Sequence, residues 1–580
     1  MACEAWVIQG GVMTKAGDCL ANGDNAWGYV CRLLFSALLI AAGGGVRGQT
    51  MPDPARLREQ LNVPPATSST NSLPEMTGNP TAGVPAGLQA IRVWLQDISI
   101  EGNTALTAAD LERAFAAYRG REVTGTEIFA LAQSLTTQYR NAGYFLSTVV
   151  VPPQSLAQGR LTLRVIEGYV SEVFIEADEK LRPFLVQIGE RIRHSRPLRA
   201  DVLERYLLTA QEVPGLQLRS VLTPSKAPGA ADLTLVARLR RLEGQVSLDN
   251  YGTRYLGPNQ VSVGLALNQV LTPTDQLRYL GAGSGDTEMS YHQLTYSKLL
   301  DEQGWRLGAT LFQARTQPGD TLAIQDIRGR ADGVSLQLSY PLQRTRHQSA
   351  WIRLAFDSTD IDTDVLGVRT VEDRIRVLRL GWSWQRFDRW DGSNSLDVDY
   401  SQGVGGTSRS DLLKSRVGAD GLFSKWTFEY TRQQPLADGW SLHAGVAGQW
   451  TGDTPLLSSE QFALGGRRYG RAYEPAELVG DRALALRLES RRNGRGSWPG
   501  LQAYQGYVFY DLGQVTQLGV LAADAPATRS LASAGVGVRL SLFAQITAQL
   551  EAAWPLTRPL SSAGEQGKAA RLLGALSMRF

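Results

Sequence analysis

Apolar and polar side chains alternate along most of residues 243–580. In 545–554 one face consists of Ile546, Ala548, Leu550, Ala552 and Trp554, and the other consists of Gln545, Thr547, Gln549 and Glu551. Because the side chains of a strand point alternately to its two faces, this period of two predicts β-strands. The polar faces carry charges that a dry core would not tolerate unpaired. An apolar outside around a polar inside is the pattern of a β-barrel in lipid.

The length of this region predicts sixteen strands in a transmembrane antiparallel β-barrel. About 21 residues are available for each strand and its connection, which fits spans of about ten residues joined by turns and loops. The last strand ends on Phe580, and a terminal Phe is the signal that bacterial barrel-insertion machinery favours. A soluble sandwich of two sheets is the alternative, but it would need one dry face on each sheet.

Residues 91–240 instead mix helical and extended patterns, which predicts two copies of one small α+β module. In 91–168 an extended segment precedes two helices, each opened by a capping box, and two extended segments follow. Residues 169–240 repeat this order more loosely, with one helix predicted over 201–211. The fold prediction is therefore two small domains followed by the barrel at 243–580.

Residues 49–90 form a linker rich in Pro, Ser, Thr and Gly. A short helix is predicted over 54–61, because Asp53 can serve as its N-cap and Pro54 fits its first turn.

The first 48 residues predict a secretory signal sequence with an N-terminal extension. The apolar run 33–42 follows Arg32 and precedes small residues, so cleavage near Gly48 is expected. This run is too short to cross a bilayer of about 30 Å as a helix, although an uncleaved anchor is the alternative. Met13 is an alternative start of the chain. The three cysteines all precede the cleavage point, so a mature chain without disulfides is expected; they are Cys3, Cys19 and Cys31.

Composition narrows the classes of function. Hydrophobic residues make up 43% of the chain and its mean hydropathy is -0.18, which argues against a helical membrane protein. The net charge of +3, with both signs abundant, gives no reason to expect nucleic acid as a partner. The four histidines have no ligand-like spacing, and the sequence contains no phosphate loop or nucleophile elbow. We therefore expect no metal, no cofactor and no catalytic residue, so the chain is not predicted to be an enzyme.

One set of residues in the first module has a diagnostic spacing. It consists of Tyr139, Gly143, Tyr144, Pro153, Gln154, Gly159, Glu167 and Gly168. Segment 137–170 resembles the first POTRA domain of two-partner secretion transporters, the haemolysin and filamentous-haemagglutinin exporters that are relatives of BamA. Segment 213–235 resembles their second POTRA domain, and 248–260 resembles the entry to their first barrel strand. The resemblance covers about residues 90–580.

Two further motifs of this family are matched in the barrel region. The family carries V-R-G-Y/F at the tip of its sixth extracellular loop, which folds back into the barrel. The corresponding loop lies between predicted strands eleven and twelve, and its motif residues are Gly465, Gly466, Gly470, Arg471 and Tyr473, with Gly470 and Ala472 departing from the family pattern. The F-x-D-x-G motif of predicted strand thirteen is matched by Phe509, Asp511 and Gly513, which share the inward face. The resemblance implies that Arg471 pairs with Asp511, whereas a solvated loop arginine is the alternative.

The resemblance implies an outer-membrane transporter of a Gram-negative bacterium. Its periplasmic POTRA domains would capture an unfolded exoprotein, which carries an N-terminal secretion domain, by pairing with an open sheet edge. The barrel would then export this client without ATP. The implied further partners are the barrel-assembly machinery, periplasmic chaperones and outer-membrane lipid. POTRA domains that act only as spacers are the alternative for 91–240.

Two other functions compete with export. An assembly factor, which inserts other proteins into the outer membrane, would be expected to carry more POTRA domains than the two predicted here. A passive porin has no use for 91–240, and an inserted Arg471 loop would obstruct its pore. In relatives an N-terminal helix plugs the barrel. The helix predicted at 54–61 would be about 12 Å long at 1.5 Å per residue, which predicts a partial plug at most.

Overall fold

The computed structural model describes residues 6–9, 12–15, 53–61, 75–76, 91–285, 287–406, 408, 410–520, 526–561 and 569–580. The predicted signal sequence falls mostly outside these ranges. Within it the structure describes one antiparallel pair, β1 (Trp6–Gln9) and β2 (Val12–Lys15). In the described part of the chain, the helices are all too short or too polar to cross a membrane.

The short helix predicted in the linker is present as η1 (Pro54–Arg56) followed by α3 (Leu57–Leu61). Its cap is also as predicted, because the backbone N–H of Ala55 donates to the Asp53 carboxylate at 2.9 Å. Further along the linker, β3 (Glu75–Met76) pairs in parallel with a strand of the second module.

The first module has the two predicted helices and the two strands predicted after them. Its first extended segment forms two strands, however, and a further strand that is missing from the prediction lies between the helices. Its elements are β4 (Arg92–Leu95), β5 (Asp97–Glu101), α4 (Ala108–Phe115), η3 (Ala116–Tyr118), β6 (Arg121–Thr124), α5 (Gly125–Asn141), β7 (Thr148–Val150) and β8 (Arg160–Ile166). Strands β5, β8 and β7 form one sheet, and β4 pairs with β6. The buried face of α5 closes the core on this sheet with Ile128, Leu131, Leu135 and Tyr139.

The second module repeats the first more closely than its sequence predicts. Its elements are β9 (Tyr169–Glu176), α6 (Arg182–Arg193), α7 (Ala200–Gln211), β10 (Leu216–Pro224) and β11 (Ala230–Leu239). Helix α6 is missing from the sequence prediction, although Pro183 in its first turn and a buried stripe of Phe184, Ile188 and Ile192 mark it. Gln187, Glu190 and Arg191 lie between the members of this stripe and Arg193 follows it, and these polar residues obscure the stripe in the sequence.

Sixteen antiparallel strands close into a barrel, which confirms the predicted number. They are β12 (Leu242–Asp249), β13 (Gln260–Asn268), β14 (Asp275–Ser284), β15 (Met289–Leu299), β16 (Arg306–Thr316), β17 (Arg328–Arg344), β18 (Gln348–Val365), β19 (Val368–Phe387), β20 (Ser393–Gly405), β21 (Ser424–Pro435), β22 (Trp440–Thr451), β25 (Arg482–Arg495), β26 (Leu501–Thr516), β27 (Thr528–Leu542), β28 (Ile546–Pro555) and β29 (Arg571–Arg579). The barrel closes where β12 pairs with β29.

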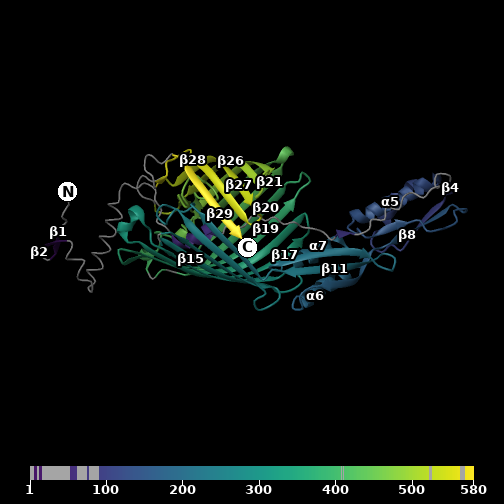
Figure 1. Cartoon of the computed structure of the whole chain (residues 1–580), viewed down its shortest axis with the longest axis horizontal. Coiled ribbons are helices and arrows are strands. Elements are labelled where there is room, and N and C mark those ends of the chain that lie inside the picture. The colour runs from purple at the N-terminus through teal and green to yellow at the C-terminus, as the bar shows by residue number, and fades with distance from the viewer. Residues whose placement is uncertain are drawn as a thin grey trace.

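The barrel and the two modules lie in a row, with the second module beside the barrel and the first module farthest from it (Figure 1). We call the barrel end beside the second module the module end and the opposite end the loop end. The second module is fixed to short turns at the module end, because Glu212 contacts Arg344 at 2.8 Å and Arg191 contacts Glu302 at 2.8 Å.

The outer face of the barrel is apolar, as the alternation predicts. Leu442, Leu484, Leu488 and Leu550 are exposed there, and their polar neighbours in sequence face the lumen. Towards the loop end the lumen is filled by a buried apolar cluster from the wall, the loops and α3. Its large members include Leu57, Tyr291, Phe312, Ile375, Val377 and Phe423.

Phe580 extends the barrel seam beyond β29. Its backbone N–H donates to the Gly244 carbonyl and its carbonyl accepts from the Gly244 N–H, both at 3.0 Å. The ring covers the outer face of Gly244, where an added Cβ would come within 2.2 Å of the ring. A glycine at this position therefore lets the terminal aromatic ring lie flat on the seam.

Candidate functional site

The connection between β22 and β25, residues 452–481, folds back into the barrel, and we call it the lumen loop. Its stem is the pair β23 (Phe462–Leu464) and β24 (Leu478–Gly480). The motif glycines Gly465 and Gly466 have φ of +107° and +81°, which favours glycine. A Cβ on Gly465 would also lie 2.1 Å from the Glu474 carbonyl oxygen. These two glycines therefore make the tight turn that sends the loop tip back on itself.

The tip brings Arg471 to the predicted carboxylate. Arg471 donates to both oxygens of Asp511, through Nε at 2.9 Å and through Nη2 at 2.8 Å. The same carboxylate accepts the backbone N–H of Arg471 at 3.1 Å. A bidentate geometry of this kind is specific to arginine. Both side chains are almost completely buried, so the alternative of a solvated loop arginine does not describe this structure.

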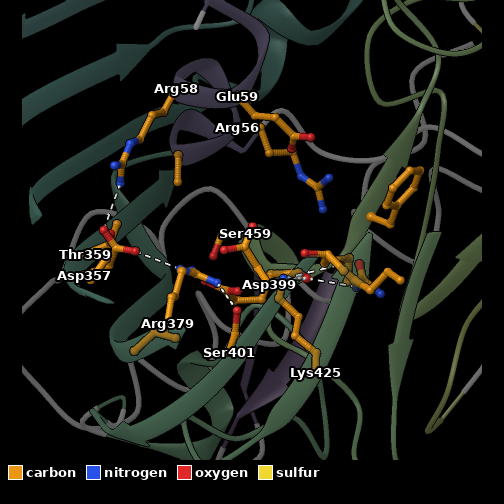
Figure 2. Close-up of a pocket in the computed structure, with 18 of the residues that line it drawn as sticks. Arg56, Arg58, Glu59, Asp357, Thr359, Arg379, Asp399, Ser401, Lys425 and Ser459 are labelled. Atoms are coloured by element: carbon orange, nitrogen blue, oxygen red, sulfur yellow. Dashed lines mark hydrogen bonds and ion pairs between the residues drawn. The ribbon is translucent and has the colours of Figure 1, made fainter. Parts of the chain in front are cut away.

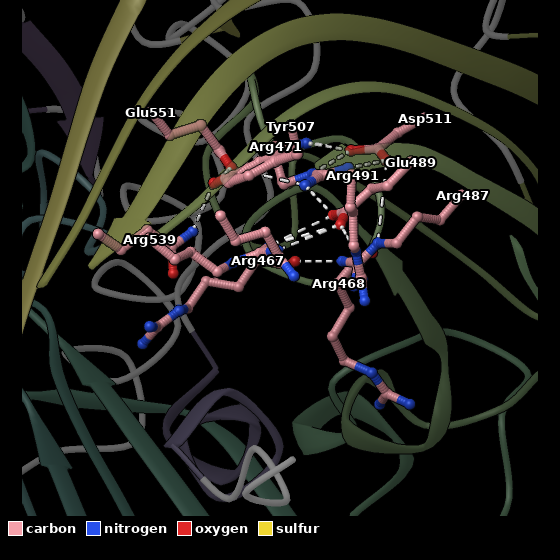
Figure 3. A network of polar contacts seen from close by, with 12 residues as sticks. Arg467, Arg468, Arg471, Arg487, Glu489, Arg491, Tyr507, Asp511, Arg539 and Glu551 are labelled. Carbon is pink, nitrogen blue, oxygen red and sulfur yellow. Dashed lines mark hydrogen bonds and ion pairs between the residues drawn. The ribbon is translucent and has the colours of Figure 1, made fainter. Parts of the chain in front are cut away.

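Two more carboxylates surround the same guanidinium (Figure 3). Arg471 Nη1 lies 2.6 Å from Glu489 on β25 and 3.5 Å from Glu551 on β28. The Tyr507 hydroxyl donates to Glu551 at 2.8 Å. The sequence places Glu551 on a polar strand face, and polar pore lining explains both Glu489 and Glu551 there without a role in the site. Both face inward, Glu489 on the strand next to that of Asp511 and Glu551 two strands away, so the three-dimensional register brings them to the site.

The remaining motif residues shape the space around this ion pair. The Arg471 guanidinium lies over the Phe509 ring, with its carbon 3.5 Å from the ring centre. Gly513 leaves room for Leu464 of the loop stem, since a Cβ there would come within 2.6 Å of that side chain. The Tyr473 hydroxyl donates towards the Ala532 carbonyl at 3.2 Å. Each residue of the F-x-D-x-G motif thus contacts the lumen loop.

Gly470 and Ala472, which depart from the family pattern, both fit the tip of the lumen loop. Gly470 has a φ of +88°, which a valine would adopt only with strain, and a Cβ would come within 2.6 Å of Leu531. Ala472 is completely buried. The tip geometry of this chain therefore requires glycine at 470 and tolerates a methyl group at 472.

Three further arginines border the site, so four guanidiniums face three carboxylates. Arg491 contacts Glu489 at 2.6 Å, and Arg539 contacts the same carboxylate at 3.4 Å. Arg487 lies 3.9 Å from Asp511 and also donates to the carbonyls of Arg467 and Arg468 in the loop. Removal of any one carboxylate would leave a marked excess of buried positive charge.

The short N-terminal helix lies in the lumen against the opposite wall (Figure 2). Arg58 is 3.5 Å from Asp357 on β18, and Arg56 donates to the Ser458 carbonyl of the lumen loop. Glu59 is 3.1 Å from Arg468 at the loop tip. A cavity of about 550 Å³ remains between the helix and the wall. The helix and the lumen loop are therefore joined to each other as well as to the barrel.

The POTRA motif residues lie far from the lumen and organise the first module. The Gln154 side chain exchanges two hydrogen bonds of 2.7 Å with the backbone of Thr162 on β8. It thereby continues the strand pairing that Pro153 cannot provide. Gly159 turns with a φ of +68° beside the Trp94 carbonyl. The Glu167 carboxylate accepts the Ala105 N–H at 2.9 Å.

Other members of that motif join the two modules. The backbone N–H of Leu198 donates to the Gly168 carbonyl and that of Ala200 donates to the Gly143 carbonyl, both at 2.8 Å. Gly168 packs so closely on Leu146 that a Cβ would lie 2.3 Å from it. Tyr139 is buried beneath this joint and contacts the edge of the Tyr144 ring. Burial, together with the negative charge of Glu167, raises the pKa of Tyr139, so its hydroxyl stays a neutral donor.

Replacing Asp511 by Asn would keep the shape of the side chain and remove its charge. We expect the free energy that holds the loop in the lumen to fall by about 3–5 kcal/mol, the usual cost of breaking a buried ion pair. The tip residues Arg467 and Arg468 would then become cleavable by trypsin in the folded barrel. The matched control is Asp453→Asn, which makes the same change at a fully exposed carboxylate of the lumen loop. Equal trypsin resistance of the two variants and the unchanged chain would contradict this role of Asp511.

Comparison with known proteins agrees with this architecture. Residues 231–540 match the family model of the haemolysin secretion/activation protein ShlB/FhaC/HecB, and residues 93–168 match that of the ShlB-type POTRA domain. The heme/hemopexin transporter protein HuxB of Haemophilus influenzae strain 86-028NP is 23% identical over 410 residues, 69% of this chain and 72% of HuxB. The outer membrane transporter CdiB of Dickeya dadantii strain 3937 is 24% identical over 500 residues, 81% and 84% of the two chains.

Solved structures share the fold. CdiB from Escherichia coli superposes with a TM-score of 0.69 at 19% identity and covers 91% of this chain and 95% of its own. CdiB from Acinetobacter baumannii gives a TM-score of 0.61 at 15% identity, with 97% and 98% covered. The family model matches residues 231–540, which is more than half of this chain, and the chain therefore belongs to the haemolysin secretion/activation protein family.

Proposed function

We propose that this protein exports an unfolded exoprotein across the outer membrane of a Gram-negative bacterium by two-partner secretion. The observation that carries the proposal is the lumen loop, held inside a barrel of this family by the bidentate pair between Arg471 and Asp511. HuxB and CdiB, the relatives with which the chain aligns over most of its length, are both named as transporters.

The two modules, at 91–168 and 169–240, would lie in the periplasm and receive the client. Small sheets with open edges can pair with any extended chain through the main chain, without reading much of its sequence. In the first module β5 and β7 are the edge strands. In the second module β9 is one edge, whereas the other edge is partly covered by β3. The barrel-assembly machinery, periplasmic chaperones and outer-membrane lipid would be the further partners.

Two functions of other classes fit the geometry less well. An assembly factor would be expected to carry additional POTRA domains beyond residues 91–240. A porin would gain nothing from a loop and a helix that fill much of its lumen. Export without ATP requires that the pore be closed at rest and opened by the client. Folding of the client outside the cell would give the movement its direction.

Export is expected to depend on the sign of charge at two positions. Arg471→Asp and Asp511→Arg should each abolish export, since each puts like charges together inside the site. The double swap should also fail, because an aspartate at 471 would face Glu489 and Glu551. An isolated ion pair would instead be rescued by the swap.

The measurement is the amount of exoprotein in the medium of cells that express this chain together with a candidate exoprotein that carries an N-terminal secretion domain. Heat-modifiable migration of each variant on a gel verifies barrel insertion. Arg495→Asp, at an exposed position on β25, is the matched control. Normal export by Arg471→Asp would overturn the proposed role of the loop.

The lumen helix would act as a partial plug. Removing residues 49–62 should raise single-channel conductance in planar bilayers, but only moderately, because the lumen loop would still fill part of the pore. Glu59→Gln, which breaks the contact with Arg468, should increase the frequency of brief openings without changing the fully open level. A conductance that is the same with and without residues 49–62 would rule out a plug.

A further inference from the structure

A second cavity runs along one side of the barrel lumen. It has a volume of about 1000 Å³ and lies against the inward faces of β12–β16. Across the cavity, this wall faces the lumen loop and the short helix, which contribute Arg467, Arg468 and Glu59. The cavity is therefore the part of the lumen that these two elements leave open.

The wall of this cavity differs in chemistry from the rest of the lumen. Its inward residues carry amides and hydroxyls, and we call it the neutral wall, represented by Ser247, Ser262, Gln276, Gln293, Thr295 and Thr310. Charged side chains also line this wall: Glu243, Arg306 and Arg579 lie towards the module end and Asp249 towards the loop end. Between them Arg278 donates to Gln276 at 3.2 Å. By contrast, Asp357, Arg379, Glu460 and Lys425 form a continuous series of ion pairs on the other side.

Most of the ion pairs that anchor the lumen elements lie on the charged walls, and one further pair joins Arg467 to Asp249 on β12 at 3.5 Å. Arg471 binds carboxylates on β25, β26 and β28, and Arg58 binds Asp357 on β18. Side chains of the neutral wall instead form short-range contacts with one another, such as Thr295 with Thr310 at 3.1 Å and Gln245 with Ser247 at 3.1 Å. Neutral hydrogen bonds of this kind exchange readily for bonds to another amide.

The cavity begins where the second module joins the barrel. Its lining at the module end includes Arg240, which follows β11, and Glu243, at the start of β12. Arg306, which donates to the Glu212 carbonyl of the second module at 3.0 Å, borders the same opening. A chain released from a sheet edge of the second module would therefore meet the neutral wall first.

We propose that the neutral wall is the track along which an extended client polypeptide moves through the barrel. The inference rests on the export function proposed above and names the surface that the client contacts. A moving chain must satisfy its backbone N–H and C=O groups at every step, and side-chain amides and hydroxyls can donate and accept alike. Amides and hydroxyls predominate in the middle of the track, where Arg278 is the charged side chain, so this part offers few strong binding sites for charged client side chains. Weak, repeated sites favour movement over tight binding.

The test uses a disordered synthetic polypeptide of Gly, Ser and Asn with a basic leading end and one cysteine carried as a thiopyridyl mixed disulfide. A channel thiolate attacks this disulfide and thiopyridine leaves. Voltage draws it from the module end into single channels in a planar bilayer. Thr295→Cys places a thiol on the neutral wall, and Thr431→Cys places one on the opposite wall at a similar height. Both threonines are half-buried and face inward. Cys3, Cys19 and Cys31 are replaced by Ser in both variants.

We expect disulfide formation between the polypeptide and the channel to be about tenfold faster for Thr295→Cys than for Thr431→Cys, because the client is held close to the neutral wall. A small charged thiol reagent should modify both cysteines at similar rates, which corrects for intrinsic reactivity. Equal rates with the polypeptide, or a faster reaction at 431, would overturn the track and leave export through the lumen intact. If the polypeptide neither cross-links at either position nor blocks the current, the track and the proposed export function are both wrong.

Discussion

A guanidinium buried inside a protein must be matched by negative charge, and this requirement determines the organisation of the lumen. Arg471 reaches the wall only because Gly465 and Gly466 turn the loop back, and it stays there because Asp511, Glu489 and Glu551 converge on it. Three carboxylates this close together would be unfavourable without the arginine. Loop and wall therefore depend on each other, and the closed lumen follows from that dependence.

The lumen is divided according to its chemistry. One charged wall holds the lumen loop and another holds the short helix, and the contact between Arg468 and Glu59 joins these two elements. Towards the loop end, the apolar cluster around Leu57, Tyr291 and Phe312 excludes water. The neutral wall borders the space that remains open. Breaking an ion pair of the short helix would therefore also weaken the support of the lumen loop, and the reverse holds as well. This coupling gives a physical route by which an entering client could open the pore.

The sequence predicts the barrel well because period two and lipid exposure leave a strong signal in every strand. The capping boxes likewise locate α4 and α5. Helix α6 is missed because its apolar stripe is diluted by polar and basic residues. Residue patterns alone do not identify Arg471 as a buried group; the family resemblance does so. Glu489 and Glu551 join the site through tertiary register, which a single sequence does not display. The glycines at the joint between the modules serve backbone contacts that are visible only in three dimensions.

The central claim is that the loop tip is a buried part of the resting barrel. Hydrogen–deuterium exchange of the detergent-solubilised protein tests it directly, through the peptides that cover residues 464–478. The account predicts exchange as slow as that of the barrel strands, since the backbone N–H groups of Gly470 and Arg471 donate to a buried carboxylate. Exchange as fast as that of exposed loop residues such as Leu412 and Val417 would contradict it.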